Sequence, residues 1–529
     1  MKRSLFLGAL AATAVSSPAF AATIEIGPSA DLKAEIGKLK AGDELVLQAG
    51  TYTLNSRVGI SAKGTAAMPI TIRSKAGGTA HIVQTANQNV LNVDMTEYII
   101  LSGLEISGGS HGIRVDDSDF ITIEDCDIHN TGDVGLSANV PNKSYQGLIF
   151  RRNHIHDTGG TGEGMYLGCN NGGCTMFDSL IEGNYIHNTD GSSVSQGDGI
   201  ELKQGSYNNI IRDNVIHNTK YPCIIVYGTA GKPVNLIERN AVWACADNAI
   251  QAEADVIIRN NLILGAGGDA IHSRNHQQNQ VKDLTIVHNT IVNPGTAVRT
   301  QNIAGKVVIA NNAIYSQNGN AIQLSGTTTQ ATVKGNVGSG NVQGTSGGFD
   351  GSGNIANDFV DANYTGKRNV YPKAGSKLIG AGDTAYVEKD DYNGTQRGGV
   401  ADVGAYKFDA SGNPKPPVGP GFKDSPGGGG SPGTGGASGT GGSPGTGGAT
   451  GTGATAGAAG GAGVGPGGAT GTGAATGSGG SAAGTGGSAA KDADDDSGCG
   501  CRTAASAPAT HLAWFGVLGF FAWARRRRR

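Results

Sequence analysis

A short phrase repeats along the sequence, and this repeat limits the fold more than any other feature. The phrase Asn-x-Ile-His-Asn/Asp-Thr occurs as NHIHDT, NYIHNT and NVIHNT, beginning at Asn153, Asn184 and Asn214. Weaker copies begin at Cys126, Asn240, Asn261, Asn289 and Asn312. The steps between copies run from about 21 to 31 residues, within the period range of solenoids and β-helices. One such unit cannot bury its apolar face alone, so the units must stack on one another.

Between about residues 100 and 340, each repeat contains three short strand patterns. The first is the Asn-x-Ile strand, and the second combines small residues with an aliphatic one, as in EGMYLG and DGIELK. The third has the form of SLIEGN and NIIRDN. Three strands per turn predict an all-β parallel β-helix. The repeated Asn is expected to stack inward at a turn and to hydrogen-bond to the Asn of the next turn.

The ends of the repeat domain, expected to span residues 22–408, carry different patterns. Residues 29–39 place Leu32, Ile36 and Leu39 at helical spacing behind a Ser/Asp start, which predicts a short helix closing the open end of the stack. At the other end, residues 341–408 are expected to supply closing strands.

Both termini resemble targeting segments. Residues 1–21 have a charged start, an apolar run and an Ala-x-Ala site, which predicts a signal peptide and export. Residues 409–490 are rich in Gly, Ser, Thr and Ala, which predicts a disordered linker. In residues 491–529, Cys499-Gly-Cys501 precedes an apolar run, expected to form a helix, and five arginines. This order resembles the myxobacterial C-terminal sorting signal (MYXO-CTERM), which implies display at the cell surface or outer membrane; an ordinary membrane anchor is the alternative.

Composition and cysteines limit the partners. The net charge of −3 offers no footprint for nucleic acid, and a monomer is expected. Export permits disulfides, and Cys169 and Cys174 flank a short loop that would let them pair. Cys126, Cys223 and Cys245 cannot all pair among themselves, so at least one is expected to be a small buried side chain.

Alternation along the second strand pattern predicts two outward columns of side chains. Residues i and i+2 of a strand share a face, and strand layers lie about 4.8 Å apart. The first column reads Arg114, Ser137, Tyr166, Glu201, Ile225, Gln251, His272, Arg299 and Gln323. The second reads Asp116, Asn139, Gly168, Lys203, Tyr227, Glu253, Arg274, Gln301 and Ser325. Acids, bases and aromatic rings should therefore share one patch.

This patch has the groups that a uronic-acid lyase needs: a base for the C5 proton, and charge that neutralises the sugar carboxylate. We assign Lys203 as the base and Arg274 as the carboxylate fork. His272 and Tyr166 complete the catalytic candidates; the candidates for substrate binding are Tyr227, Gln251 and Arg299. The oxygens predicted to bind calcium belong to Glu201, Glu253 and Asp198. The alternative is that these residues only form cross-strand pairs on a solvated sheet face.

The histidines of the repeat phrase invite a metal interpretation. His129, His156, His187 and His217 occupy one repeat position over successive turns. The simpler interpretation is a copied surface position, since no carboxylate or Cys is expected beside them at ligand spacing.

The repeats, with AGDELVLQAGTYTL and GTAAMPITIRS ahead of them, resemble the right-handed parallel β-helix proteins of the pectate-lyase-like superfamily. The resemblance covers about residues 23–408. In those enzymes a lysine base, an arginine and calcium perform the reaction, and only Lys203 in DGIELK corresponds clearly. The resemblance implies a protein that acts on an acidic polysaccharide by β-elimination. A non-catalytic glycan-binding adhesin is the alternative, and a glycoside hydrolase using Glu201 and Glu253 is the third interpretation.

Overall fold

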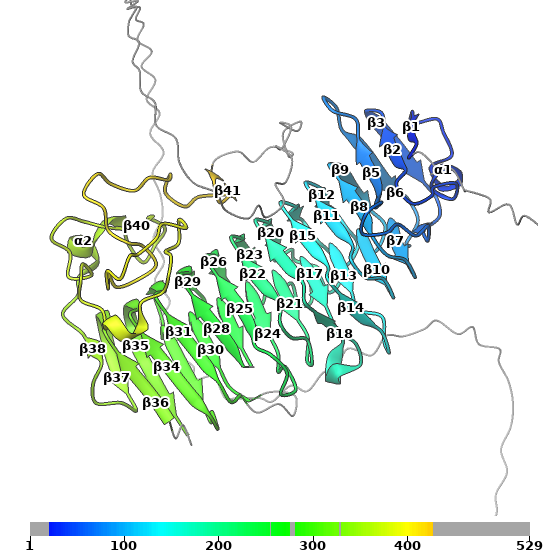
Figure 1. Cartoon of the computed structure of the whole chain (residues 1–529). Helices are drawn as coiled ribbons and strands as arrows, with labels where there is room; N and C mark the ends of the chain where they lie inside the picture. Colours follow the sequence, from blue (N-terminus) through cyan, green and yellow to red (C-terminus); the bar gives the residue numbers. More distant parts are fainter. Residues whose placement is uncertain (1–20, 254, 276–280, 327–329, 427–529) are drawn as a thin grey trace, which may run out of the picture. The chain divides into compact units, whose positions relative to one another are not determined.

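The computed structural model describes residues 21–426, except 254, 276–280 and 327–329. Most of these residues form one coil of short parallel strands, in which each turn lies on the one before it (Figure 1). A 13-stranded sheet forms one column, and a 23-stranded sheet contains the other two. The predicted parallel β-helix with three strands per turn is confirmed. The predicted signal peptide, most of the predicted linker and the predicted C-terminal apolar helix fall in residues 1–20 and 427–529, which lie outside the described residues.

The first strand column is the 13-stranded sheet. Its strands are β1 (Thr23–Ile26), β2 (Glu44–Leu47), β5 (Ile70–Ser74), β8 (Ile99–Ser102), β11 (Thr122–Glu124), β15 (Ile149–Arg151), β19 (Leu180–Glu182), β22 (Ile210–Arg212), β25 (Asn235–Glu238), β28 (Val256–Arg259), β31 (Leu284–Val287), β34 (Lys306–Ala310) and β36 (Gln330–Lys334).

The second column contains the Asn-x-Ile strands. Its members are β3 (Gly50–Leu54), β6 (Ala80–Gln84), β9 (Leu104–Gly108), β12 (Asp127–His129), β16 (His154–His156), β20 (Tyr185–Thr189), β23 (Val215–Thr219), β26 (Ala241–Cys245), β29 (Leu262–Ala266), β32 (Thr290–Asn293), β35 (Ala313–Ser325) and β37 (Asn336–Gln343).

The third column carries the predicted patch. Its strands are β4 (Val58–Ile60), β7 (Leu91–Asp94), β10 (Ile113–Asp116), β13 (Leu136–Ala138), β17 (Met165–Leu167), β21 (Ile200–Leu202), β24 (Ile224–Val226), β27 (Ile250–Ala252), β30 (Ile271–Ser273) and β33 (Val298–Gln301). The long strand β35 belongs to both columns, because its first half pairs with β32 and its second half with β33.

Stacked aliphatic side chains fill the inside of the coil. The Ile of the repeat phrase is fully buried in successive turns, as at Ile155, Ile186 and Ile216. The described residues contain two disulfides, Cys169–Cys174 and Cys223–Cys245, and Cys126 is a buried free thiol. The predicted Cys169–Cys174 pair and the expectation of at least one buried unpaired cysteine are therefore confirmed.

The repeated asparagines form a continuous hydrogen-bonded ladder. The side-chain Nδ2 of Asn214 donates to Oδ1 of Asn240 at 2.9 Å, and Asn184 donates to Asn214 in the same way. The ladder residues are Asn153, Asn184, Asn214, Asn240, Asn261, Asn289, Asn312 and Asn336. Each ladder asparagine follows a residue with positive φ, such as Asp213 (φ 57°), so the backbone turns sharply where the amide points inward.

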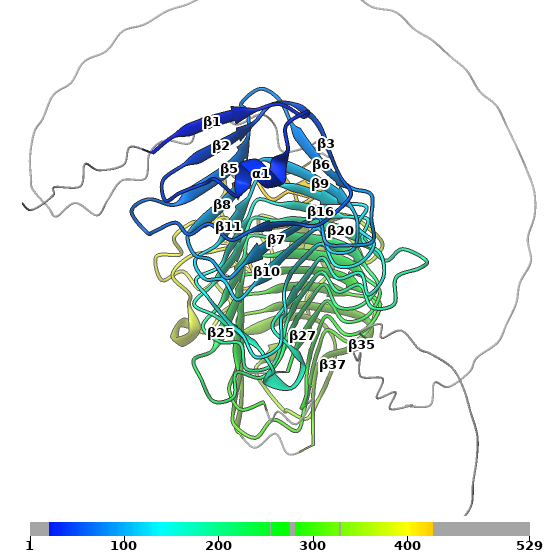
Figure 2. The same cartoon turned by 90° about the vertical axis from the view of Figure 1, so that its right-hand side faces the viewer.

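The two ends of the coil are closed differently. Helix α1 (Leu32–Ile36) lies at the N-terminal end with Leu32 and Ile36 buried, and Asp31 caps it by accepting from the Ala34 N–H (Figure 2). The capping helix predicted in residues 29–39 is therefore present. After β37 and β38 (Phe349–Asp350), the chain forms α2 (Ile355–Asp358), β39 (Phe359–Ala362) and β40 (Arg368–Pro372).

The chain after β40 packs against the outer face of the second column (Figure 1). It ends in the hairpin β41 (Gly421–Phe422) and β42 (Ser425–Pro426). Tyr392 and Tyr406 from this part join Tyr185 and Trp243 in a second apolar core. The remaining elements are β14 (Ser144–Gln146), β18 (Thr175–Phe177) and the 3-10 turns η1 (Asn170–Gly172) and η2 (Thr384–Tyr386). The described fold thus continues beyond the boundary expected at residue 408. Among the described residues, no helix is long and apolar enough to cross a membrane.

Candidate functional site

The third column places the predicted patch in the expected register. Tyr166 pairs with Glu201, Glu201 with Ile225, and the same column continues through Gln251 and His272 to Arg299. The register does not shift at β24, although its sequence lacks the small residue that precedes the aliphatic one elsewhere. The sequence therefore predicts this column correctly, residue by residue.

The patch is more enclosed than a solvated sheet face. Lys203 is 5% exposed, Glu201 3%, Gln251 7% and Glu253 0%. Burial of four polar side chains on the outward side of a strand column is unfavourable unless each finds a partner. Simple cross-strand pairing in water therefore does not describe these residues.

Lys203 lies at the centre of the patch. Its ammonium forms an ion pair with Glu201 and lies over the rings of Tyr166 and Tyr227, 4.7 and 4.9 Å from their centroids. The Tyr227 hydroxyl donates a hydrogen bond to Oε1 of Glu201 at 3.3 Å. Burial, which has the largest effect on Tyr227, raises the pKa of its hydroxyl. Two rings and a carboxylate therefore hold the amine in a fixed position within an enclosed site.

Three carboxyl groups converge beside this lysine. Glu163, Asp198 and Glu201 are all buried, and each offers an oxygen within 4.8 Å of the others. Burial, followed by the charge of Glu201, raises the pKa of Glu163 to about 7. Burial and the same neighbour raise the pKa of Asp198 well above its usual range. Three carboxyl groups this close cannot all stay ionised unless protons or a cation compensate their charge.

The ligand atoms of the carboxylate cluster suit a hard cation. All of its ligand atoms are oxygens, the set that Ca²⁺ prefers. One oxygen each of Glu163 and Glu201, the Oε1 and Oε2 atoms respectively, is buried with no hydrogen-bond partner in the described chain. Of the three predicted calcium ligands, the structure brings Asp198 and Glu201 together, and Glu163 is the third member of the cluster.

Glu253 has a different environment. Its Oε1 accepts a 2.6 Å hydrogen bond from Gln251, whose own Oε1 accepts from Asn248 at 2.9 Å. Burial raises the pKa of Glu253 to about 8, so it is mostly a neutral acid at pH 7. It lies two turns beyond Glu201 along the coil.

Arg274, His272 and Arg299 lie further toward the C-terminal end. Arg274 is exposed and stands three strand layers, about 14 Å, beyond Lys203. The Nε of Arg299 lies 2.9 Å from Asp269, and burial lowers the pKa of His272 to about 4. These residues can contact a long ligand, but Arg274 stands too far along the coil to hold the carboxylate of the sugar at Lys203.

Sequence reasoning missed Glu163, although a signal for it exists. Glu163 and Asp198 each precede the Gly that leads into their strand, so they hold one repeat position in consecutive turns. The prediction used this position only at Asp198 and did not extend it to the preceding turn. A related network continues on the N-terminal side, where Asp133 accepts from the Thr161 hydroxyl at 2.8 Å and that hydroxyl also bonds to Glu163 at 2.6 Å.

Comparison with known proteins supports the fold. A Pel9A-like right-handed β-helix region matches residues 14–190, and a general right-handed β-helix region matches residues 176–302. No match was found among curated proteins. Together with the strand topology, these matches show a right-handed parallel β-helix.

Solved structures of the same architecture are similar at low sequence identity. The structure of XylC in complex with xylose is 10% identical, covers 73% of this chain and 98% of its own, and gives a TM-score of 0.53. Pectate lyase Pel9A is 15% identical, with coverage of 73% and 96% and a TM-score of 0.46. An alginate lyase from Paenibacillus sp. str. FPU-7 is 19% identical, with coverage of 62% and 99% and a TM-score of 0.39. At these identities the likeness shows the fold alone.

Proposed function

We propose that this protein acts on an acidic polysaccharide by β-elimination at Lys203. The observation that supports the proposal most is the enclosed lysine beside three converging carboxyl groups, since a basic amine and an oxygen-lined cation site are the two groups that this chemistry requires. The match of residues 14–190 to a Pel9A-like region agrees with this substrate class, because Pel9A is a pectate lyase.

In the proposed reaction Lys203 removes the proton at C5 of a uronic acid, and the bond between C4 and its glycosidic oxygen then breaks. This leaves a C4–C5 double bond in the product. Tyr166 is the less buried of the two tyrosines at Lys203, and we assign its hydroxyl as the donor of a proton to the leaving oxygen. Glu163, Asp198 and Glu201 would hold the calcium ion, which supplies the positive charge that neutralises the sugar carboxylate.

Glu201 links the two halves of the site. In the present arrangement its carboxylate forms an ion pair with the Lys203 ammonium, which cannot accept a proton. Engagement of Glu201 by a cation would weaken that pair, and Lys203 would then act as the free amine. Turnover is therefore expected to require calcium even where substrate binds without it.

The test is the ultraviolet absorbance of the unsaturated product on polygalacturonate, alginate and glycosaminoglycans, with calcium and with a chelator. Lys203→Ala should abolish the signal. Lys232→Ala is the matched control, because Lys232 also lies over a tyrosine ring, 4.3 Å from the centroid of Tyr207, but outside the site. Binding without any product on all three substrates would instead favour the glycan-binding adhesin.

Glycoside hydrolysis is the second candidate, because one observation favours it. Glu163, with its pKa raised to about 7, has an oxygen within 4.8 Å of an oxygen of Glu201, which forms an ion pair with Lys203. A protonated acid close to an ionised one is the pair that retaining glycosidases use at separations of about 5 Å. New reducing ends without the unsaturated chromophore would establish this reaction in place of elimination.

We propose that the protein is exported and that its C-terminal segment holds it at the cell surface. This proposal rests on the signal-like residues 1–21, on the Cys-x-Cys, apolar and arginine-rich order of residues 491–529, and on the two disulfides, which are typical of exported proteins. Cell fractionation with an antibody to the β-helix tests it.

A further inference from the structure

A second cluster of ionisable side chains lies on the outer face of the second column, away from the strands that carry Lys203. His156 pairs with His129 of the turn before it and with His187 of the turn after it, so the repeat position forms a continuous row. His154 lies beside His156, because residues i and i+2 of a strand share a face. A copied surface position explains the row itself. It does not explain His154, which lies beside the row at a position that the repeat phrase leaves variable.

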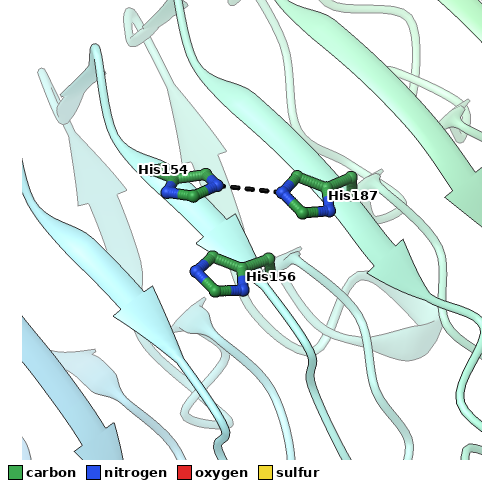
Figure 3. Close-up of side chains that lie close together, drawn as sticks. All are labelled: His154, His156 and His187. Carbon is green, nitrogen blue, oxygen red and sulfur yellow. Dashed lines mark hydrogen bonds between the residues drawn. The ribbon is translucent and has the colours of Figure 1, made fainter. Parts of the chain in front are cut away.

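The three histidines lie close enough to share one ligand. Nε2 of His154 and Nε2 of His187 face each other at 2.9 Å (Figure 3). The ring of His156 stacks against that of His154, with 4.1 Å between centroids. Each of the three rings has a nitrogen within 4.8 Å of the others. The two nitrogens form a hydrogen bond when one ring carries its proton on Nε2, and a metal ion bound between them would replace that proton.

Polar groups stand behind these rings and fix their orientation. Oδ1 of Asp127, from the preceding turn, lies 3.2 Å from Nδ1 of His154. Oδ2 of Asp157 lies 2.6 Å from Nδ1 of His156, and the side chain of Asn188 hydrogen-bonds to His187. The expectation that no carboxylate stands beside the histidines is therefore wrong. A carboxylate on the far nitrogen is the usual support of a metal-binding imidazole, since it orients the ring and leaves the other nitrogen for the metal, as at His154. Oδ1 of Asp127 also lies 3.2 Å from Nε2 of His156, so an ion bound by that nitrogen would displace this contact.

We propose that His154, His156 and His187 form a binding site for one divalent transition-metal ion of the zinc class. Imidazole nitrogen suits Zn²⁺, and Zn–N bonds of about 2.0–2.1 Å in a tetrahedron put neighbouring ligand atoms about 3.4 Å apart. The facing nitrogens of His154 and His187 need to separate only by about 0.5 Å to reach that spacing. His156 must turn about its χ2 angle, a broad torsion, because a metal lies in the plane of each ring that binds it.

The surroundings leave one open side. The ring of Phe422, from hairpin β41–β42, lies edge-on to His154, with 6.5 Å between centroids, and closes the site on that side. His154 is 7% exposed, while the side chain of His156 is 17% exposed, so an ion would enter past His156. The bound ion would connect β16 and β20, two successive turns, and should stabilise the coil there. The ligands are nitrogens and the position lies in another strand column, so this site is independent of the oxygen cluster at Lys203.

The test is titration of the untagged, chelator-treated protein with Zn²⁺ by calorimetry, followed by the visible spectrum of the Co²⁺ form. We expect one saturable Zn²⁺ per chain, a tetrahedral Co²⁺ spectrum, and no competition from millimolar Ca²⁺. His187→Ala should weaken Zn²⁺ binding at least tenfold. His217→Ala is the matched control: it removes the next ring of the same row, whose Nε2 lies 3.0 Å from the Tyr185 hydroxyl and outside the cluster.

Asp127→Asn provides a second variant that preserves the shape of the site if a histidine variant fails to fold. It should weaken Zn²⁺ binding about tenfold by removing the charge behind His154. Absence of saturable binding by the unaltered protein would overturn the proposal. Equal losses of Zn²⁺ affinity in His187→Ala and His217→Ala would show adventitious binding to surface histidines and would overturn the proposal as well. So would the binding of several weak Zn²⁺ equivalents that Asp127→Asn does not affect.

Discussion

Glu163 lies beside Asp198 in the next turn of the coil, and the backbone N–H of the residue after Glu163 donates to the carbonyl oxygen of Asp198 at 2.8 Å. The two acids therefore stack at the spacing of adjacent strands, with Glu201 completing the cluster. Like charges at this spacing repel, so the cluster stores an unfavourable interaction that protons or a cation must relieve.

Replacing Glu163 by Gln should separate the effects of charge and of calcium. We expect Glu163→Gln to melt higher than the unaltered protein in chelator, because one of the three crowded carboxyl groups is gone. Calcium should bind at least about tenfold more weakly, because one ligand oxygen loses its charge. Melting curves with and without calcium measure both effects. Glu97→Gln is the control, since the Glu97 side chain is 47% exposed and far from the cluster. Equal stabilisation of both variants by calcium would contradict the assignment.

The asparagine ladder should be sensitive to a single deletion. Oδ1 of Asn214 accepts from both the backbone N–H and the Nδ2 of Asn184, at 2.9 Å each, and its own Nδ2 donates to the carbonyl of Ile181. Asn214→Ala leaves these buried groups without partners, which should cost about 2–4 kcal/mol of unfolding free energy. The urea midpoint measures the loss. Asn87→Ala, at an exposed position, should change it by less than about 0.5 kcal/mol. A ladder variant as stable as this control would show that the amide stack is not needed.

The raised pKa of Glu253 predicts a loss of stability as the pH rises. Burial raises its pKa in the folded protein to about 8 from an ordinary value of 4.5. The folded state therefore binds more protons than the unfolded chain between these values, and the contribution of Glu253 to stability falls as the pH rises through that window. Glu253→Gln keeps an acceptor for Gln251 and removes the titration. In chelator, its melting temperature should fall less between pH 6 and pH 8 than that of the unaltered protein, whereas Glu97→Gln should behave as the parent does. If the melting temperatures of all three proteins fell equally between pH 6 and pH 8, a group other than Glu253 would be responsible.

The column that carries Lys203 could be predicted from the sequence because it depends only on the period of two in a strand and on one anchor residue per turn. Ile200 and Ile224 fix the register on either side of the site, and the register holds. The asparagine ladder could be predicted for the same reason. Burial could not be predicted, because it depends on the loops between strands, whose lengths vary from turn to turn. The approach of Asp127 to His154 could not be predicted, since the second position of the phrase varies along the repeats, as Asp127, His154 and Tyr185 show.

Lys423 should anchor the end of the described chain. Its ammonium pairs with Oδ1 of Asp213, donates to the carbonyl oxygen of Tyr392 at 2.6 Å and lies 4.0 Å from the centroid of that ring. Lys423→Ala leaves the partly buried Asp213 with Arg239 alone, and we expect a loss of about 1–3 kcal/mol in unfolding free energy. Lys415→Ala is the control, because Lys415 pairs with Asp424 at the surface, where ion pairs contribute little. Similar urea midpoints for the two variants would show that the hairpin is only loosely held.

Truncation after Pro426 tests the proposed anchor separately from the fold. Removing residues 427–529 takes away none of the described contacts, so the melting temperature should stay within about 1 °C of the full chain's. The location should change: with residues 1–21 retained, the truncated protein should accumulate in the medium, because the apolar run before the five terminal arginines is gone. A truncation that begins at residue 409 also removes Phe422 and Lys423 and should melt lower, which makes it the control for loss of packing. Retention of the Pro426 truncation on cells would place the attachment in the β-helix itself and would favour the adhesin over the anchored enzyme.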